Sequence, residues 1–164
     1  MDPVEMSLKY TFRRLGPDDA DSLAALMRVF GAAFGEPATY GQKPLSAAYV
    51  RQQLGKEHVI AVVGETQGEV VGGLVAYVLD KLEDERREVY LYDLAVAEAH
   101  RRRGVARGVI RELQRIAAGL GASVIFVQAD IEDGPAIALY ETLGPRITAY
   151  HFEFDAADDQ AGSG

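Results

Sequence analysis

The sequence predicts an α+β (mixed α/β) fold in which helices cover both faces of a central sheet. Two observations predict it. Three β-branched, apolar segments, 59–63, 70–79 and 88–96, follow one another without an intervening helical pattern, as in a sheet of neighbouring strands. Strand-like and helix-like segments then alternate toward the end of the chain. This combination is typical of a mixed sheet between two layers of helices.

The N-terminal part predicts one strand and two helices. Residues 10–14 form the first expected strand, and Pro17 and Asp18 are start signals for the first helix. The apolar stripe of that helix recurs at helical spacing and comprises Leu23, Leu26, Met27, Phe30 and Phe34. A loop rich in Gly and Pro, 35–44, leads to a short helix over 46–54.

The C-terminal part predicts two further helices and two strands. The strongest amphipathic pattern covers 105–120, and its apolar face comprises Val105, Val109, Leu113, Ile116 and Leu120. We expect a buried strand over 124–128, a short helix over 135–143, and a strand over 146–155 that closes the sheet.

Length and composition favour one globular domain over 1–155, followed by a polar tail over 156–164. The chain contains no cysteine, which excludes disulfides, thiolate chemistry and Cys-ligated zinc. No metal site is expected. The N-terminus lacks the pattern of a signal peptide, and no apolar run approaches the roughly 20 residues of a membrane span. We therefore expect a cytoplasmic protein without a membrane partner.

The charge pattern indicates two kinds of ligand. The net charge of −8 argues against nucleic acid as a partner, because phosphate neutralisation needs a basic surface. Arginines concentrate between 101 and 115, whereas after residue 129 Arg146 is the only Lys or Arg. The acids of that later stretch are Asp130, Glu132, Asp133, Glu141, Glu153, Asp155, Asp158 and Asp159. One region thus suits an anionic ligand and the other a cationic ligand.

The segment Arg101-Arg102-Arg103-Gly104-Val105-Ala106 opens the amphipathic helix and has the features of an anion cradle. The first N–H groups of a helix have no partner within it and lie at its positive end. Gly104 removes a side chain where a pyrophosphate would approach the backbone. Arginines at this end are unfavourable for the helix dipole, so three of them together favour a bound anion over a solvated turn.

Two motifs resemble those of the GNAT acetyltransferases. Arg101-x-x-Gly104-x-Ala106, after a strand that ends in Leu94-x-Val96, is similar to the acetyl-CoA signature Q/R-x-x-G-x-G/A. The segment from Asp133 through Tyr140 to Gly144 resembles the pattern N-x-x-A-x-x-x-Y-x-x-x-G, with Asp133 where asparagine is usual and Pro145 where an aromatic residue is usual. The resemblance implies a mostly antiparallel central sheet that splays between its two middle strands.

Further blocks resemble the type I aminoglycoside 3-N-acetyltransferases, the gentamicin-modifying group. They are Phe34-Gly35, Ala38-Thr39-Tyr40, Tyr92-Asp93-Leu94-Ala95-Val96 and Val127-Gln128-Ala129-Asp130. The resemblance extends from about Leu15 to Asp155. It implies acetylation of the 3-amino group of an aminoglycoside, which confers antibiotic resistance, and it implies a possible homodimer.

The resemblance also implies how the cofactor binds. Acetyl-CoA, which leaves as coenzyme A, would place its pantetheine arm against the backbone of 93–96 and its pyrophosphate on 102–106. The expected cofactor-binding residues are Leu94, Ala95, Val96, Arg101, Arg102, Arg103, Gly104, Val105 and Ala106. Tyr140 matches the tyrosine that meets the sulfur and would protonate the departing thiolate. The alternative for Tyr140 is an aromatic residue of the core.

The base that takes the proton of the amine is either Asp93 or Glu88. The two are five positions apart on one strand, so they should face opposite sides of it unless a bulge intervenes. Asp93 is preferred because it adjoins the expected splay. The alternatives are a structural carboxylate for Asp93 and a plain surface charge for Glu88.

The acceptor is expected to be a small polycationic amine. Its candidate binding residues are Glu36, Tyr40, Asp130, Glu132, Asp133, Glu153 and Asp155. Taken singly, each acid is better explained as solvated surface, but as a cluster beside the helix of Tyr140 the acids favour a cation site. Two other functions remain open. One is acetylation of a polyamine or another small amine, and the other is a non-catalytic CoA-binding module, against which Asp93 and Tyr140 both argue.

Overall fold

The structure, a computed structural model, describes residues 7–157. The chain divides into two compact units, residues 1–128 and residues 129–164. The single domain expected over 1–155 stays a prediction. Residues 158–164 of the expected tail, including Asp158 and Asp159, lie outside the described residues.

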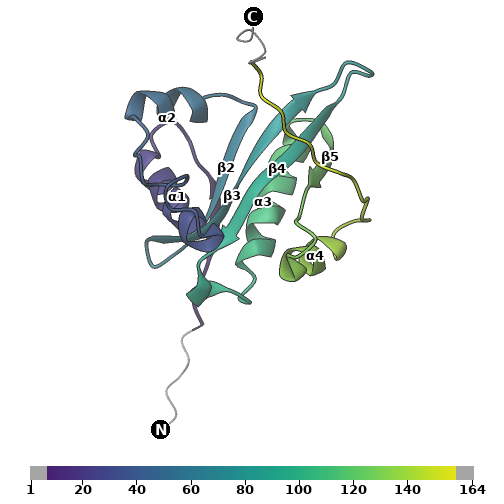
Figure 1. Cartoon of the computed structure of the whole chain (residues 1–164). Helices are drawn as coiled ribbons and strands as arrows, with labels where there is room; N and C mark the ends of the chain where they lie inside the picture. The colour runs from purple at the N-terminus through teal and green to yellow at the C-terminus, as the bar shows by residue number, and fades with distance from the viewer. Residues whose placement is uncertain (1–6, 158–164) are drawn as a thin grey trace, which may run out of the picture. The chain divides into compact units, whose positions relative to one another are not determined.

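A five-stranded sheet in the order β1-β2-β3-β4-β5 forms the centre of the first unit (Figure 1). The strands are β1 (Thr11–Arg14), β2 (Val59–Thr66), β3 (Glu69–Asp80), β4 (Arg87–Val96) and β5 (Ala122–Val127). The first four pair antiparallel in chain order, and β5 joins β4 in parallel. The sheet is therefore mostly antiparallel and mixed, as expected.

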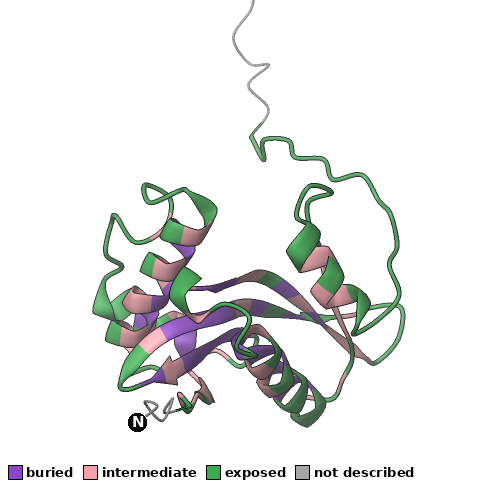
Figure 2. Ribbon diagram, turned by 90° about the horizontal axis from the view of Figure 1, so that it is seen from below, coloured by how far each residue is buried: buried purple, intermediate pink, exposed green. Residues whose placement is uncertain are grey.

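Helices cover both faces of this sheet (Figure 2). They are α1 (Ala20–Phe34) and α2 (Ala47–Leu54) on one face, and α3 (Val105–Gly119), which follows the short 3₁₀ turn η1 (Glu98–His100), on the other. Two adjacent residues of β4 show that α1 and α3 pack on opposite faces of the sheet. Ala95 packs in a core cluster with Leu26 and Phe30 of α1, whereas Val96 packs with Val105 of α3. Neighbouring residues of a strand point to opposite faces.

The amphipathic pattern of α3 is confirmed. Val109, Ile110 and Leu113 of this helix are all buried. Gly108 lets the helix approach the sheet, because a Cβ atom there would lie 2.0 Å from the ring of Phe12. A side chain at this position would force α3 away from β1.

The sheet splays where the resemblance predicts. The pairing of β4 with β5 ends at Leu91 opposite Val127, whereas β4 itself continues to Val96. Along 92–96 the edge of β4 that faces away from β3 is therefore not paired with β5. A second strand-like chain, such as a pantetheine arm, can bind to backbone groups at that edge.

The second unit contains α4 (Gly134–Glu141). Asp133 caps this helix, since its Oδ1 accepts a hydrogen bond from the Ala136 N–H at 3.1 Å, and Pro135 stands in the first turn. The short helix predicted here is thus confirmed.

Two expectations about strands are wrong. The segment 146–155 contains no strand, although its apolar and polar residues alternate. Alternation allows a strand, but a strand forms only where a neighbouring chain completes the ladder of hydrogen bonds. The segment instead exposes its aromatic residues, with Phe152 81% and Phe154 92% exposed. The strand expected over 124–128 does form, as β5, but it is an edge of the sheet and its Val124 is 45% exposed rather than buried.

Candidate active site

A β-bulge in β4 brings two acidic residues to one face of the sheet. The register pairs Val75 with Asp93 but Ala76 with Leu91, so Tyr92 is an extra residue in β4. The bulge reverses the alternation of side chains beyond it. Asp93 and Glu88 therefore face the same side, whereas regular alternation predicted opposite sides.

Asp93 lies on the face covered by α1 and forms a hydrogen bond with the loop that follows this helix. The hydroxyl of Tyr40 donates to Asp93 Oδ1 at 3.3 Å. Partial burial raises the pKa of Asp93 above its ordinary value of 3.8, the Tyr40 hydrogen bond opposes this shift, and the negative charge of Glu36 adds to it. Partial burial likewise raises the pKa of Tyr40 to about 12, with the charge of Asp93 contributing. The Tyr40 phenol therefore stays neutral and donates its hydrogen bond to a carboxylate that binds a proton more tightly than an ordinary aspartate does.

Local packing fixes Tyr40 in this position. Its ring lies edge-on to Phe30, with centroids 5.9 Å apart, and at 5.4 Å from Phe34. Gly31 allows the loop to lie against α1, since a Cβ atom there would come within 2.8 Å of the Tyr40 carbonyl oxygen. The Tyr40 N–H also bonds to the carbonyl of Glu36 at 3.0 Å. The structure therefore brings together three predicted residues, Glu36, Tyr40 and Asp93.

Glu88 has a different environment. Arg86 Nη1 donates to Glu88 Oε1 at 2.7 Å, and this carboxylate is 19% exposed. Glu88 pairs with Leu79 of β3, and Asp93 pairs with Val75, four residues away on the same strand. At about 3.3 Å per residue, Glu88 and Asp93 are therefore roughly 13 Å apart along the sheet. An ion-paired carboxylate at that distance is a weaker candidate base than Asp93.

Four aromatic side chains, Tyr77, Tyr90, Tyr92 and Phe126, form a surface beside Asp93 that the sequence did not reveal. We call it the aromatic wall. Tyr90 stacks on Phe126 with centroids 4.7 Å apart, and Tyr92 lies 5.3 Å from Tyr90 and 5.9 Å from Tyr77. Burial raises the pKa of Tyr77, and the neighbouring Asp93 adds to the shift. The pattern Tyr90-x-Tyr92 was a signal for the wall, but only the bulge shows that Asp93 shares its face.

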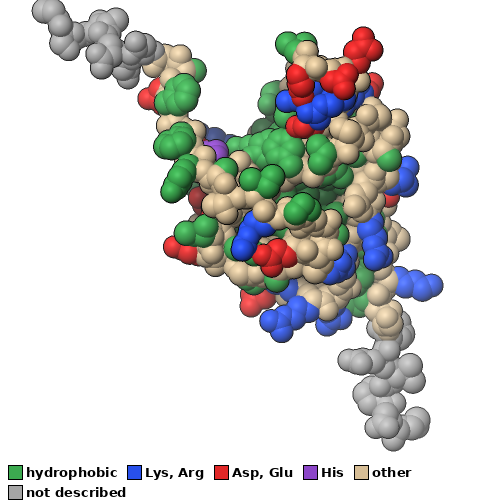
Figure 3. Space-filling view, turned by 90° about the vertical axis from the view of Figure 1, so that its right-hand side faces the viewer, with side chains coloured by type: hydrophobic (Ala, Val, Ile, Leu, Met, Phe, Trp, Pro, Cys, Tyr) green, Lys and Arg blue, Asp and Glu red, His purple; other side chains and the backbone are tan. Residues whose placement is uncertain are grey.

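The wall is partly open to solvent, since Tyr77 and Tyr92 are both exposed. Figure 3 shows hydrophobic side chains gathered beside an end of the molecule where acidic and basic side chains intermix. The connection between β3 and β4 carries such a mixture, since Arg86 pairs with Glu83 and Glu88, and Arg87 pairs with Asp80 at 2.8 Å. Ion pairs therefore offset part of the charge of this connection.

The expected cradle has the backbone geometry of an anion site. Arg102 and Gly104 have positive φ angles of 59° and 83°, and the first helical hydrogen bond of α3 runs from the Gly108 N–H to the Gly104 carbonyl at 3.0 Å. The N–H groups of Val105 and Ala106 precede that bond and lie at the positive end of the helix. These N–H groups could meet an anion, and the binding of a pyrophosphate by 102–106 stays a prediction.

The other expected cofactor residues contribute in different ways. Arg101 turns back, and its Nε donates to the carbonyl of Val96 at 3.1 Å, which ties the cradle to the end of β4. Arg102 and Arg103 are exposed. Ala95 and Val96 bury their side chains, and Leu94 is half-buried. These three residues can offer a cofactor their backbone groups at the splay.

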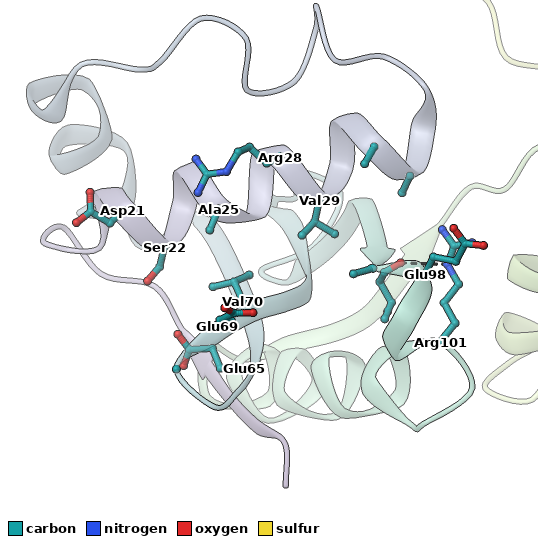
Figure 4. Close-up of a pocket in the computed structure, with 15 residues that line it drawn as sticks. Asp21, Ser22, Ala25, Arg28, Val29, Glu65, Glu69, Val70, Glu98 and Arg101 are labelled. Carbon is teal, nitrogen blue, oxygen red and sulfur yellow. Dashed lines mark hydrogen bonds between the residues drawn. The ribbon is translucent and has the colours of Figure 1, made fainter. Parts of the chain in front are cut away.

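A cavity of about 650 Å³ lies between α1, the turn that joins β2 to β3, and the segment 96–101 (Figure 4). Its lining includes Glu65, which is paired with Arg13 at 3.0 Å. Val96 and Arg101 also line it, but Asp93 does not. The cavity therefore adjoins the cradle at Arg101 and does not include the Tyr40–Asp93 pair.

The remaining predicted residues belong to the second unit. Tyr140 is half-buried, and burial raises the pKa of its phenol to about 12, with the charge of Asp133 as a further cause. The five predicted acids, Asp130, Glu132, Asp133, Glu153 and Asp155, are all exposed. Glu153 pairs with His151 at 3.0 Å, and Asp133 serves as the helix cap. Their roles toward an acceptor stay predictions.

Within residues 7–157, no group of three or more His, Cys, Asp or Glu side chains could hold a metal ion. No helix in that range is long and apolar enough to cross a membrane.

Two aminoglycoside acetyltransferases are among the solved structures that resemble this chain. The chain is 46% identical to an aminoglycoside acetyltransferase from an uncultured soil metagenomic sample, with a TM-score of 0.88 over 91% of this chain and 99% of that one. It is 25% identical to a second soil metagenomic aminoglycoside acetyltransferase, whose crystal contained sisomicin, with a TM-score of 0.82 over 90% and 97% of the two chains.

Sequence comparisons agree in the type of protein. Residues 23–144 match the family model described as the acetyltransferase (GNAT) family. N-acetyltransferase family 8 member 2 of Rattus norvegicus is 30% identical over 91 residues, which is 55% of this chain and 40% of that protein. The chain spans about 40% of the length of the curated relatives that it matches.

Proposed function

Since the chain belongs to the GNAT family of acetyltransferases, we propose that it transfers an acetyl group to an amine of a polycationic aminoglycoside, at the 3-amino position. The splayed mixed sheet with helices on both faces is the GNAT fold. Enzymes of this family take the acetyl group from acetyl-CoA, which confirms the expected cofactor. The acceptor and its position belong to the proposal.

The half-buried carboxylate of Asp93 is the observation that carries the proposal. Its pKa is raised, so its affinity for a proton is closer to what a general base needs than that of an ordinary aspartate. It lies where β4 separates from β5, beside the edge that suits pantetheine. Asp93 would take the proton of the acceptor amine as the new C–N bond forms. Tyr40 would hold the carboxylate in place.

The thioester of acetyl-CoA supplies the electrophilic carbonyl when the cofactor is bound. The cradle from Arg102 to Ala106 would hold its pyrophosphate, and the backbone of 94–96 would align its pantetheine arm. Tyr140 would give its proton to sulfur as the C–S bond breaks. Its high pKa keeps this phenol protonated at neutral pH, as a proton donor requires.

Charge and likeness both support an aminoglycoside acceptor. Glu36 and Asp93 place two carboxylates on one side of the acceptor region, and the chain carries a net charge of −8. An acidic surface attracts a polycation and speeds its encounter. A protein 46% identical along nearly its whole length is an aminoglycoside acetyltransferase. By this likeness the activity would confer resistance to drugs such as gentamicin. A homodimer stays a prediction.

A linear polyamine is the second candidate acceptor, because the same acids would also pair with its ammonium groups. The deciding experiment measures thiol release from acetyl-CoA with gentamicin, sisomicin and spermidine, and locates the acetyl group by NMR. We expect turnover with the aminoglycosides and a product acetylated at the 3-amino group. Thiol release with spermidine alone would favour the polyamine, and cofactor binding without turnover of any amine would indicate a non-catalytic module.

A further inference from the structure

The aromatic wall has no role in the chemistry described so far, yet it is built from three strands. Tyr77 comes from β3, Tyr90 and Tyr92 from β4, and Phe126 from β5. The register places Tyr77 opposite Tyr90 and Tyr90 opposite Phe126, so their rings share one face. Tyr90 is held by a hydrogen bond from its hydroxyl to Gln128 Oε1 at 2.8 Å. Ring contacts and this hydrogen bond therefore position the aromatic side chains of the wall relative to one another.

Two of its rings are notably open. Tyr92 is 56% exposed and Tyr77 is 39% exposed, although aromatic side chains gain much from burial. Tyr92 is also the extra residue of the β-bulge. The same bulge turns Asp93 toward α1, so the ring of Tyr92 and the carboxylate of Asp93 lie on the same face of the sheet. Exposed aromatic rings grouped next to the candidate base are more typical of a binding surface than of the edge of a hydrophobic core.

We propose that the aromatic wall binds the flat face of a ring-shaped amine and makes the enzyme select cyclic polycations over linear polyamines. This inference rests on the proposed function and specifies its acceptor. The C–H groups on the face of an aminocyclitol or aminosugar ring pack on the face of Tyr92. The ammonium groups at the edge of the same ring would pair with the Asp93 carboxylate rather than with the wall.

The physical basis of the selection is shape and rigidity. A saturated six-membered ring presents a flat apolar face to a flat side chain and loses few torsions when it binds. A linear polyamine must be straightened and immobilised, and that ordering opposes binding. The acids attract both kinds of acceptor by charge, so the wall supplies the difference between them.

The test compares Tyr92→Leu, which removes the ring, with Tyr92→Phe, which keeps it. Leu79→Ala is a matched control, because Leu79 is an exposed apolar residue of β3 on the same face, 38% exposed. At saturating acetyl-CoA and fixed ionic strength, we expect the KM for sisomicin to rise about tenfold in Tyr92→Leu. The KM for spermidine should change less than twofold. Tyr92→Phe and Leu79→Ala should stay within twofold of the wild type for both amines.

If Tyr92→Leu changes the KM for sisomicin and for spermidine equally, or leaves the KM for sisomicin unchanged, the selective role of the aromatic wall is rejected. The proposed acetyl transfer would still stand. Turnover of spermidine but not sisomicin by the wild type would reject the selective role of the wall as well. If neither amine is turned over, the proposed function fails. Calorimetric titration of sisomicin into the CoA-loaded protein then decides separately, since weaker binding in Tyr92→Leu supports the wall and unchanged binding rejects it.

Discussion

The Tyr40 hydroxyl donates a hydrogen bond to Asp93 Oδ1 at 3.3 Å, and it thereby joins the loop after α1 to the strand that carries the candidate base. The two residues are 53 positions apart in the chain. The bond stabilises the ionised carboxylate, whereas burial and the Glu36 charge stabilise its protonated form. The reactivity of Asp93 therefore depends on three identified influences that can be changed one at a time.

The pH dependence of kcat/KM should follow these influences. Asp93 acts as a base only when ionised, so activity should fall as the pH drops through its raised pKa. Tyr40→Phe removes the bond that lowers this pKa, and the acid limb should move to higher pH. Glu36→Gln removes a charge that raises it, and the limb should move to lower pH. Shifts in the same direction in both variants would contradict this assignment.

Replacing Asp93 by Asn should lower kcat by roughly 10²- to 10⁴-fold, the usual contribution of a general base, with acetyl-CoA affinity unchanged. The variant should also melt at a higher temperature at neutral pH. A carboxyl whose pKa is raised by folding destabilises the folded state above that pKa, and Asn removes this cost. Glu88→Gln is the control and should lower kcat far less, because Glu88 is paired with Arg86. A larger loss of kcat in Glu88→Gln than in Asp93→Asn would instead identify Glu88 as the general base.

Gly104→Val should weaken acetyl-CoA binding at least tenfold, which corresponds to about 1.4 kcal/mol. The φ angle of 83° at Gly104 disfavours a β-branched residue, and a side chain would stand beside the expected pyrophosphate. Gly121→Val is a matched control, since Gly121 has a φ of 75° and equally open space but lies at the other end of α3. Calorimetry should show normal cofactor affinity in the folded Gly121 variant. Equal affinities in both would reject the cradle.

Tyr140→Phe should reduce kcat by roughly 10²-fold, within the range for a general acid, and should leave the affinity for acetyl-CoA nearly unchanged because the ring is kept. Tyr150→Phe is the control, since Tyr150 belongs to the same unit and is 91% exposed. Full activity in the Tyr140 variant would assign this tyrosine to packing.

Salt should weaken the binding of a polycationic acceptor. The Debye length falls from about 10 Å at 0.1 M salt to about 3 Å at 1 M, so the KM for gentamicin should rise with salt at saturating acetyl-CoA. The increase should be smaller in the Asp130→Asn, Asp155→Asn double variant, and a monoamine should show a flatter curve. Three parallel curves would identify these acids as ordinary solvated surface.

The sequence by itself determined the order of helices and strands up to α4 and the glycine-containing turn that opens α3. The reason is that periodicity, caps and glycine depend on neighbours in the chain. The stripe of α1, the stripe of α3 and the Asp133 cap are all local patterns. The strand expected over 146–155 failed because a strand also needs a partner, which alternation alone does not supply.

Only the tertiary structure decided which side chains meet at the site. Alternation predicted that Glu88 and Asp93 face apart, but one extra residue at Tyr92 brings them to the same face. A bulge depends on the pairing of two strands, and the partner of Asp93 is Val75 on a different strand. The contact between Tyr40 and Asp93 likewise depends on how α1 and its loop pack against the sheet. Such long-range packing is not encoded in any single segment, and it is what turns an ordinary aspartate into a candidate base.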